Sequence, residues 1–196
     1  MAPEADLIHR SREGCLDAFT ELVTRYQDRV YNSIRRLGLR HAEAEEISQE
    51  TFLRAFANIG TFRGDSGFYT WTFRIAINLA RTTLRRKKLA HFAPLELQSS
   101  LNADATIERD ESAAISAKRI EAPSAAMEQR ETIEAIQAAL NQLDDELRIV
   151  AVLRDIENLD YNEIASILAC PVGTVKSRLH RARAKLRGLL TALIEP

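Results

Sequence analysis

Cysteine is scarce in this chain of 196 residues, and the two cysteines, Cys15 and Cys170, lie far apart without CxxC spacing. Such usage favours reduced thiols that pack in the interior of a protein kept in a reducing compartment. Histidine is also scarce: four residues are scattered without the paired His/Cys spacing of zinc sites. The sequence therefore predicts no metal site.

Long apolar runs are missing as well, since none approaches the roughly 20 residues of a membrane-spanning helix. The first residues, MAPEADLIHRSREG, lack the basic stretch followed by an apolar stretch that marks a secretory signal peptide. Together with the cysteine usage, these absences predict a cytoplasmic protein that is not itself a membrane protein. Hydrophobic residues still make up 45% of the chain, which suffices for buried cores.

Glycine and proline are few, with seven and five residues, and turn-bounded runs of β-branched residues are absent. Apolar residues instead recur every three or four positions almost throughout, which indicates helices. We expect a long helix whose apolar residues run from Phe19 to Ile34 and which ends near Gly38, where a left-handed cap suits glycine. Two more helices are expected over 41–58 and 68–88. The chain is therefore predicted to be all-α.

Helical spacing fails from Leu89 to about Pro123, where alanine, serine and acidic residues are frequent and aromatic residues nearly vanish. This composition is typical of a flexible linker. Helical spacing returns with Ile133 and Ile136. We therefore expect two small helical domains, an N-terminal one over 1–90 and a C-terminal one over 128–196, joined by a linker over 91–127.

Acidic residues are absent between Val172 and Leu190, although the formal net charge of the whole chain is only −1. The segment before this stretch has the apolar spacing of a short helix, and Cys170-Pro171 would end it. The stretch itself buries one apolar stripe in steps of three and four residues. A short helix, a tight turn and a longer basic helix predict a helix-turn-helix in the C-terminal domain.

The unburied faces of this basic helix carry residues that suit DNA. Arginine can bind guanine O6 and N7 with two hydrogen bonds, and lysine and serine suit phosphates or base edges. A solvated face on an ordinary bundle helix is the competing interpretation, but the proline turn and the missing acids favour DNA. The polar residues on these faces are Lys176, Ser177, Arg178, His180, Arg181, Arg183, Lys185 and Arg187.

A second cationic row follows the helix expected over 68–88. Its members lie in steps of three and four residues, so they share one face: Arg74, Asn78, Arg81, Arg85 and Lys88. The cations can follow a phosphate backbone, and the amide can read a base edge. Trp71 and Phe73 are interpreted as core residues of the same helix.

The segment FRGDSGFYT directly precedes this row. Its glycines free the backbone, its aromatic residues offer stacking surfaces for unpaired bases, and Asp65 and Ser66 offer hydrogen bonds. Whether Phe62, Phe68 and Tyr69 serve bases or the core is left open by the sequence.

A third surface is acidic and lies on the helix expected over 41–58. Glu43, Glu46 and Glu50 are spaced by three and four residues, beside Gln49. Dense acid is a poor DNA surface, so it indicates either a protein partner or a solvated face. Spacing alone favours the solvated face.

Taken in order, these segments resemble bacterial sigma factors of the extracytoplasmic-function (ECF) type, in the RpoE-like branch of the sigma-70 family. AEEISQETFLRAF is similar to that family's core-polymerase-binding helix, and TFRGDSGFYTWTFRIAINLARTTLRR is similar to its promoter-melting segment. LRDIENLDYNEIASILACPVGTVKSRLHRARAKLR is similar to its helix-turn-helix. The resemblance implies an alternative sigma factor that directs transcription initiation at stress-type promoters and is held inactive by an anti-sigma factor.

The resemblance also implies residue roles. Core polymerase would be bound by Glu46, Gln49, Glu50 and Phe52, which replaces the solvated interpretation of the acidic face. The minus-ten element, as duplex and as melted non-template strand, would be met by Phe62, Arg63, Gly64, Asp65, Ser66, Phe68, Tyr69, Arg74, Asn78, Arg81 and Arg85. The minus-thirty-five element would be met by Arg154, Lys176, Ser177, Arg178, His180 and Arg181. His180 departs from the aromatic or aliphatic residue expected at its position.

Two other interpretations compete with this one. A free-standing helix-turn-helix regulator would bind operators as a dimer, but its N-terminal domain would carry a ligand pocket or a dimer helix. A helical adaptor would bind protein through the acidic face and leave the basic faces solvated. An enzyme is disfavoured, because no phosphate-binding loop, nucleophile pair or carboxylate pair is found. The sequence therefore predicts no catalytic residue, no cofactor and no small-molecule substrate.

Overall fold

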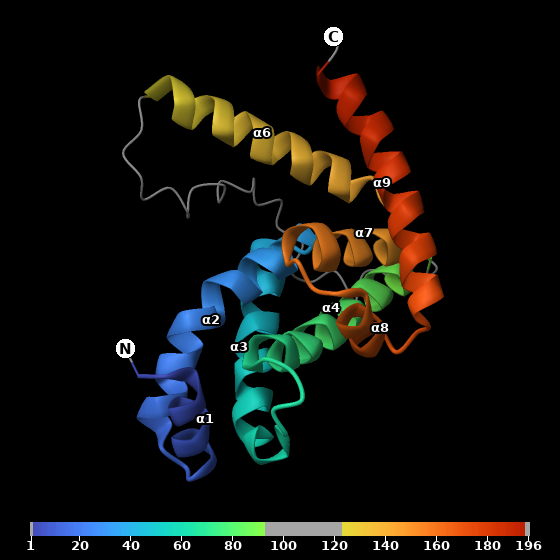
Figure 1. The fold of residues 1–196 in the computed structure, drawn as a ribbon. Helices are drawn as coiled ribbons and strands as arrows, with labels where there is room; N and C mark the ends of the chain where they lie inside the picture. Colours follow the sequence, from blue (N-terminus) through green and yellow to red (C-terminus); the bar gives the residue numbers. More distant parts are fainter. Residues whose placement is uncertain (1, 93–122, 195–196) are drawn as a thin grey trace.

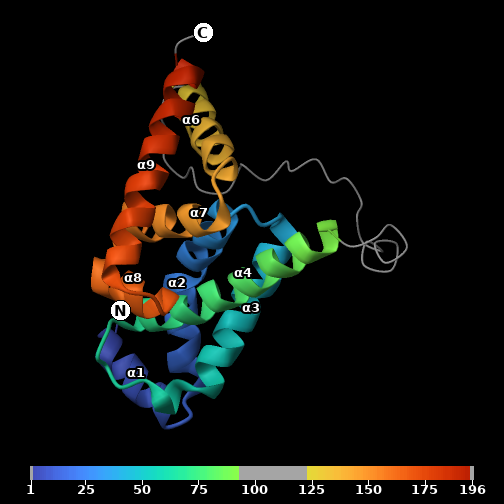
Figure 2. The ribbon, with the colours of Figure 1, turned by 90° about the vertical axis from the view of Figure 1, so that its right-hand side faces the viewer.

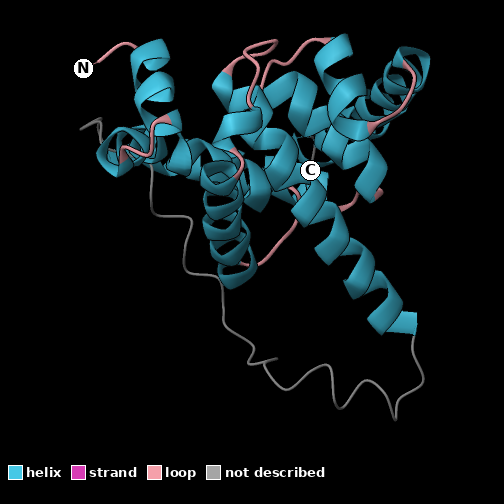
Figure 3. Cartoon of the chain, turned by 90° about the horizontal axis from the view of Figure 1, so that it is seen from below, coloured by secondary structure: helices cyan, strands magenta, loops and turns pink. Residues whose placement is uncertain are grey.

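The computed structural model describes residues 2–92 and 123–194, and every regular element in these ranges is helical (Figure 3). The N-terminal domain contains α1 (Glu4–Arg12), α2 (Leu16–Arg36), α3 (His41–Ala57), a 3-10 turn (Ile59–Thr61) and α4 (Phe68–Phe92). The C-terminal domain contains α6 (Pro123–Asn141), α7 (Asp145–Ala151), a π-helical turn (Val152–Ile156), α8 (Tyr161–Leu168) and α9 (Val172–Ile194). The all-α fold with two helical domains is confirmed.

The predicted helices of the N-terminal half match the structure closely. α2 ends at Arg36, and Gly38 follows with φ +84°, the left-handed region that glycine enters without a steric penalty. The short helices α1 and α7 were not predicted. α6 begins at Pro123, within the segment 91–127 predicted as linker, and residues 93–122 of that segment lie outside the described residues.

The core of the N-terminal domain is built around Phe68, the first residue of α4. Its ring is fully buried and lies 5.9 Å from the rings of Tyr26, Phe62 and Trp71, measured between centroids. The cluster ties α2, the loop after the 3-10 turn and the start of α4 together. Burial of Phe73 confirms it as a core residue, whereas Trp71 is only half-buried against the core.

The helix-turn-helix of the C-terminal domain is held by local capping. Asp160 caps α8 by accepting hydrogen bonds from the backbone N–H groups of Asn162 and Glu163, and the Glu163 carboxylate accepts the backbone N–H of Asp160. This reciprocal pair is a capping box. At the other end, Ala169 adopts φ +50°, and α9 starts directly after Pro171. α6 contacts α9 at its C-terminal end, and the two helices diverge from there, away from the rest of the molecule (Figures 1 and 2).

The two domains also contact each other directly, which the sequence did not predict. The π-helical turn lies against α2, and α8 lies against α4 (Figure 1). The buried guanidinium of Arg148 donates hydrogen bonds to Leu140 and Leu143 in its own domain and to the Leu37 carbonyl at 2.6 Å, just beyond α2. Burial lowers the pKa of Arg148, and four carbonyl acceptors stabilise its charge. The end of α2 is thereby bound to the C-terminal domain.

Over residues 2–92 and 123–194, no helix combines the length and apolar content that crossing a membrane requires.

Candidate nucleic-acid interface

α9 presents a polar face because its opposite side is anchored in the core. Val175, Leu179 and Ala182 are buried, so most of the polar residues between them point to solvent. Four of the predicted contacts are exposed on this face: Lys176, Ser177, His180 and Arg181. Helix α9 therefore has the form of a recognition helix that can enter a major groove.

Arg178, also predicted for this face, is placed differently. Its side chain is mostly buried and donates a 2.6 Å hydrogen bond to the Glu146 carboxylate of α7. Because this ion pair joins α9 to α7, the pair fixes the recognition helix in the domain. Arg183 plays a similar part by pairing with Asp155, which raises the pKa of Arg183.

Arg154 lies in the π-helical turn and contacts the start of α8. Its guanidinium donates a hydrogen bond to the Leu159 carbonyl at 2.8 Å and lies 5.1 Å from the centre of the Tyr161 ring. The ammonium of Lys176 lies 5.7 Å from the same ring. Tyr161 therefore connects two predicted DNA contacts by cation–π interactions, and sequence reasoning missed it. An aromatic residue at the first position of α8 was the available signal.

The cationic row of α4 is exposed only in part. Asn78, Arg81 and Arg85 point to solvent. Arg74, one turn earlier, instead donates a 2.7 Å hydrogen bond to the Ser166 hydroxyl of α8. The C-terminal domain thus covers the beginning of this row.

The loop before α4 combines exposed polar residues with buried rings. Arg63, Gly64 and Asp65 are exposed, and Gly64 has φ +82°. Ser66 is half-buried. Phe62, Phe68 and Tyr69 are buried, so in this arrangement the predicted base-stacking rings belong to the core. The three rings thus contribute to the core in this structure, and their contacts with DNA bases stay a prediction.

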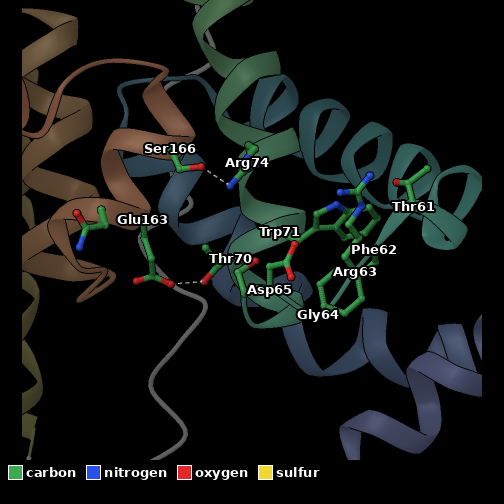
Figure 4. A pocket seen from close by; sticks show the side chains of 12 residues that line it. Thr61, Phe62, Arg63, Gly64, Asp65, Thr70, Trp71, Arg74, Glu163 and Ser166 are labelled. Atoms are coloured by element: carbon green, nitrogen blue, oxygen red, sulfur yellow. Dashed lines mark hydrogen bonds between the residues drawn. The ribbon is translucent and has the colours of Figure 1, made fainter.

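A pocket of about 460 Å³ lies between this loop and the helix-turn-helix (Figure 4). Arg63, Asp65 and Trp71 line it from the N-terminal side, and Glu163 and Ser166 of α8 line it from the other. Thr70 donates a 3.0 Å hydrogen bond to the Glu163 carboxylate across its edge.

Glu157 of the C-terminal domain is inserted among hydrogen-bond donors of the N-terminal domain. Its carboxylate accepts hydrogen bonds from the Tyr69 hydroxyl at 2.6 Å, from Arg29 Nε at 2.8 Å and from the Ser33 hydroxyl. Burial and the neighbouring Glu157 charge raise the pKa of Tyr69 well above its usual range. Sequence reasoning missed this cluster, because Glu157 lies 88 to 128 residues from its three partners.

The acidic face on α3 carries an apolar residue that was also missed. Glu46 and Gln49 are exposed, and Glu50 forms an ion pair with Arg54 at 2.5 Å. Leu53 follows on the same face with 66% of its surface exposed. Its spacing of seven from Glu46 was the available signal.

Phe52, predicted for the acidic face of α3, is only 7% exposed and packs into the core. The structure therefore separates Phe52 from Glu46, Gln49 and Glu50.

Comparison with known proteins covers both domains. Residues 22–89 match the family described as Sigma-70 region 2, and residues 133–186 match Sigma-70, region 4. The chain is 36% identical over 193 residues to the RNA polymerase sigma-H factor of Pseudomonas aeruginosa, covering 97% of this chain and 95% of that protein. It is 34% identical over 192 residues to the ECF RNA polymerase sigma-E factor of Escherichia coli K12, with coverages of 96% and 94%.

Solved structures show the same arrangement of helices. CnrH in complex with the cytosolic domain of CnrY matches with a TM-score of 0.64 and 26% identity, covering 95% of this chain and 96% of CnrH. The sigma factor RpoE of Bartonella quintana, solved with the anti-sigma factor NepR, matches in fold with a TM-score of 0.66, 23% identity and coverages of 90% and 98%.

Proposed function

This chain belongs to the extracytoplasmic-function branch of the sigma-70 family, and from that premise we propose how its surfaces divide the work of transcription initiation. As an alternative sigma factor it binds core RNA polymerase and directs it to promoters. The observation that carries the proposal is the pairing of an exposed basic recognition helix with a cationic row on α4, each in its own domain. Each domain alone would contact only a short stretch of DNA. Once core polymerase fixes the distance between the domains, binding of one domain raises the effective concentration of the other at its own DNA element.

We assign the minus-thirty-five element to α9. Lys176, His180 and Arg181 are exposed and reach base edges or phosphates in the major groove. Arg154 acts at the edge of this surface, beside Tyr161. Ser177 contributes a hydroxyl, and Arg178 mainly fixes the helix through Glu146.

We assign the minus-ten element to the loop before α4 and to the α4 row. Arg63, Gly64, Asp65 and Ser66 form the part of the loop that reaches an extruded base, and the exposed row Asn78, Arg81 and Arg85 follows the adjoining backbone. Phe62 and Phe68 support the loop from the core. Tyr69 and Arg74 join this surface when the C-terminal domain moves away.

We assign core polymerase to the face of α3 that carries Glu46, Gln49, Glu50 and Leu53. A leucine with 66% exposure amid acidic residues supplies an apolar anchor inside a charged rim. Phe52 reaches polymerase only if the end of α3 repacks on binding.

We further propose regulation by an anti-sigma factor, because a relative with 26% identity and the same fold was solved with a partner's cytosolic domain. The chain acts as a non-enzymatic subunit in the cytoplasm, where RNA polymerase is found. No residue is assigned to catalysis.

Run-off transcription tests the proposal. Purified core polymerase is given fragmented DNA of the source genome with and without the protein, and the transcripts are sequenced. New discrete starts that share two spaced elements support the proposal. Absence of new starts, with a core that is active with its housekeeping sigma factor, contradicts it.

A further inference from the structure

Glu157 occupies a site that the N-terminal domain builds for an anion. Three donors converge on its carboxylate, from Arg29, Ser33 and Tyr69. Arg29 and Ser33 share one face of α2 at a spacing of four, and Tyr69 comes from the first turn of α4. Only 3% of the Glu157 side chain is exposed, so the carboxylate depends on these donors for its charge to be tolerated.

Contacts other than those to Glu157 also hold the donors in position. The Arg29 guanidinium lies 3.8 Å from the centre of the Tyr69 ring, and the single proton of the Ser33 hydroxyl is shared between the Glu157 carboxylate and the Arg29 carbonyl, 2.8 Å away. Tyr69 also stacks on Phe73, with ring centres 5.2 Å apart. A cation beside two hydroxyls in fixed positions suits a carboxylate or a phosphate equally well.

The position of this site is informative. Tyr69 directly follows the loop that we assign to the minus-ten element, and Arg74 starts the cationic row of the same helix. In this structure both are engaged by the C-terminal domain, Tyr69 by Glu157 and Arg74 by Ser166. Under the minus-ten assignment proposed above, promoter DNA and the C-terminal domain would compete for the same surface.

We propose that Arg29, Ser33 and Tyr69 form a binding site for a DNA backbone phosphate, and that Glu157 fills this site from within the chain to keep the protein closed. The proposal rests on the proposed function and adds residues of α2 to the DNA surface. Separation of the domains would expose Ser33 and Tyr69, while Arg29 is already half-exposed. One site then has two exclusive occupants, a carboxylate in the closed protein and a phosphate in the open one.

Substituting each residue of the Arg29–Glu157 ion pair in turn distinguishes loss of closure from loss of the phosphate site. Glu157→Gln and Arg29→Gln both weaken closure, but only Arg29→Gln also removes a phosphate ligand. Glu134→Gln is the matched control, because Glu134 is exposed on α6 in the same domain as Glu157 and makes the same change of charge. Tyr69→Phe is the milder second variant, since it removes one hydroxyl and keeps the ring.

Binding of the full-length variants to a fluorescein-labelled 20-nucleotide single strand of mixed sequence is measured by fluorescence anisotropy at several salt concentrations. Glu157→Gln is expected to bind about tenfold more tightly than the wild type, because the closed population no longer withholds the site. In the Arg29→Gln variant the domains are expected to separate without the tenfold gain in DNA affinity, because the variant lacks a phosphate ligand. In the Glu157→Gln background, adding Arg29→Gln should lower the slope of log affinity against log salt by about 0.7, the loss of one phosphate contact.

Small-angle X-ray scattering of the same samples reports closure. An increased radius of gyration for Glu157→Gln and Arg29→Gln, with Glu134→Gln unchanged, is expected. Equal gains in affinity for Glu157→Gln and Arg29→Gln would overturn the phosphate site, and an unchanged radius and affinity for Glu157→Gln would overturn the closure. If Glu157→Gln fails to fold, Tyr69→Phe must show an increased radius without the full gain in affinity.

These readouts are independent of polymerase. Loss of run-off transcription with the expected binding pattern intact would contradict the proposed function alone. Transcription with equal gains for both variants would contradict the phosphate site alone.

Discussion

The two candidate DNA surfaces of this protein differ in what covers them. On α9, His180 and Arg181 face solvent, and no hydrogen bond or ion pair within the described ranges engages their side chains. On the N-terminal side, Tyr69 and Arg74 are bonded to residues of the C-terminal domain. One surface is therefore presented in the closed protein, while the other becomes complete only after the domains separate.

The difference follows from how each surface is built. The helix-turn-helix is fixed by contacts close in sequence, such as the Asp160 cap and the Glu146–Arg178 pair. The surface that we propose for the minus-ten element depends on an aromatic cluster and on the other domain. A locally built surface is ready at once, whereas a surface shared between domains can be regulated by their separation.

The largest expected effect is a loss of stability in the N-terminal domain. Phe68→Ala removes a fully buried ring from the centre of the aromatic cluster and is expected to lower the free energy of unfolding by about 3–5 kcal/mol. Trp71→Ala should cost less, since its ring is half-buried, and Asn78→Ala should leave stability unchanged because Asn78 is exposed. Urea unfolding of the three variants measures this order. Equal losses of unfolding free energy in the three variants would contradict the distinction between residues that support the fold and residues that contact DNA.

Reversal of one charge tests the presented surface. Arg181→Glu places a carboxylate where a phosphate or base edge would lie and is expected to reduce transcription from a promoter found by the run-off experiment about 100-fold, by analogy with other lost contacts to bases. Arg187→Glu, on the same helix and also exposed, is the control and should reduce it far less. Thermal stability should be unchanged in both. Equal losses would show that only the general charge of α9 matters.

The next prediction concerns a third surface, the face of α3 that we assign to core polymerase. Leu53→Ala should weaken binding to core polymerase about tenfold without affecting the fold, because 66% of the side chain is already exposed. Leu89→Ala truncates a leucine with 64% exposure on α4 and should leave binding unchanged. A titration of core polymerase with labelled protein distinguishes the two. Equal affinity of both variants would remove α3 from the polymerase surface.

The smallest expected effect concerns closure itself. A Cβ added at Gly38 would lie 2.6 Å from Arg148 Nη1, whereas one at Gly14 would meet nothing within 4 Å. Both positions have positive φ, so Gly38→Ala and Gly14→Ala share a strain of about 1 kcal/mol. Only Gly38→Ala should also loosen the domain contact and raise the radius of gyration by a few per cent. A similar rise in Gly14→Ala would assign the change to helix-cap strain.

The sequence predicted the parts of the fold that depend on local periodicity. The bounds of α3, the end of α2 before Gly38 and the break at Cys170-Pro171 follow from apolar spacing and from the backbone preferences of glycine and proline. The resemblance to ECF sigma factors is confirmed by the family matches and by relatives at 34–36% identity. α1 was missed because a short polar helix, with only Leu7 and Ser11 buried, has little apolar periodicity.

The features that required the structure depend on distant residues. Tyr69 is an aromatic residue of a type that can stack on bases. Only the structure shows that its hydroxyl donates a hydrogen bond to Glu157, 88 residues away. From the sequence alone, Arg148 would be placed on the surface like most arginines. In the structure it donates a hydrogen bond to the Leu37 carbonyl, 111 residues away. Long-range pairing of this kind leaves no periodic signal. Residue roles at the DNA and polymerase surfaces stay predictions.

The central claim is that one chain holds a covered and an uncovered DNA surface and opens when it functions. Its two cysteines lie one in each domain, Cys15 at the start of α2 and Cys170 in the turn before α9, so both can carry spin labels without substitutions. Double electron–electron resonance between them measures the separation of the domains in the protein alone and with core RNA polymerase. The account predicts one narrow, short distance for the protein alone and a longer distance with core polymerase. A distance that core polymerase leaves unchanged would contradict it.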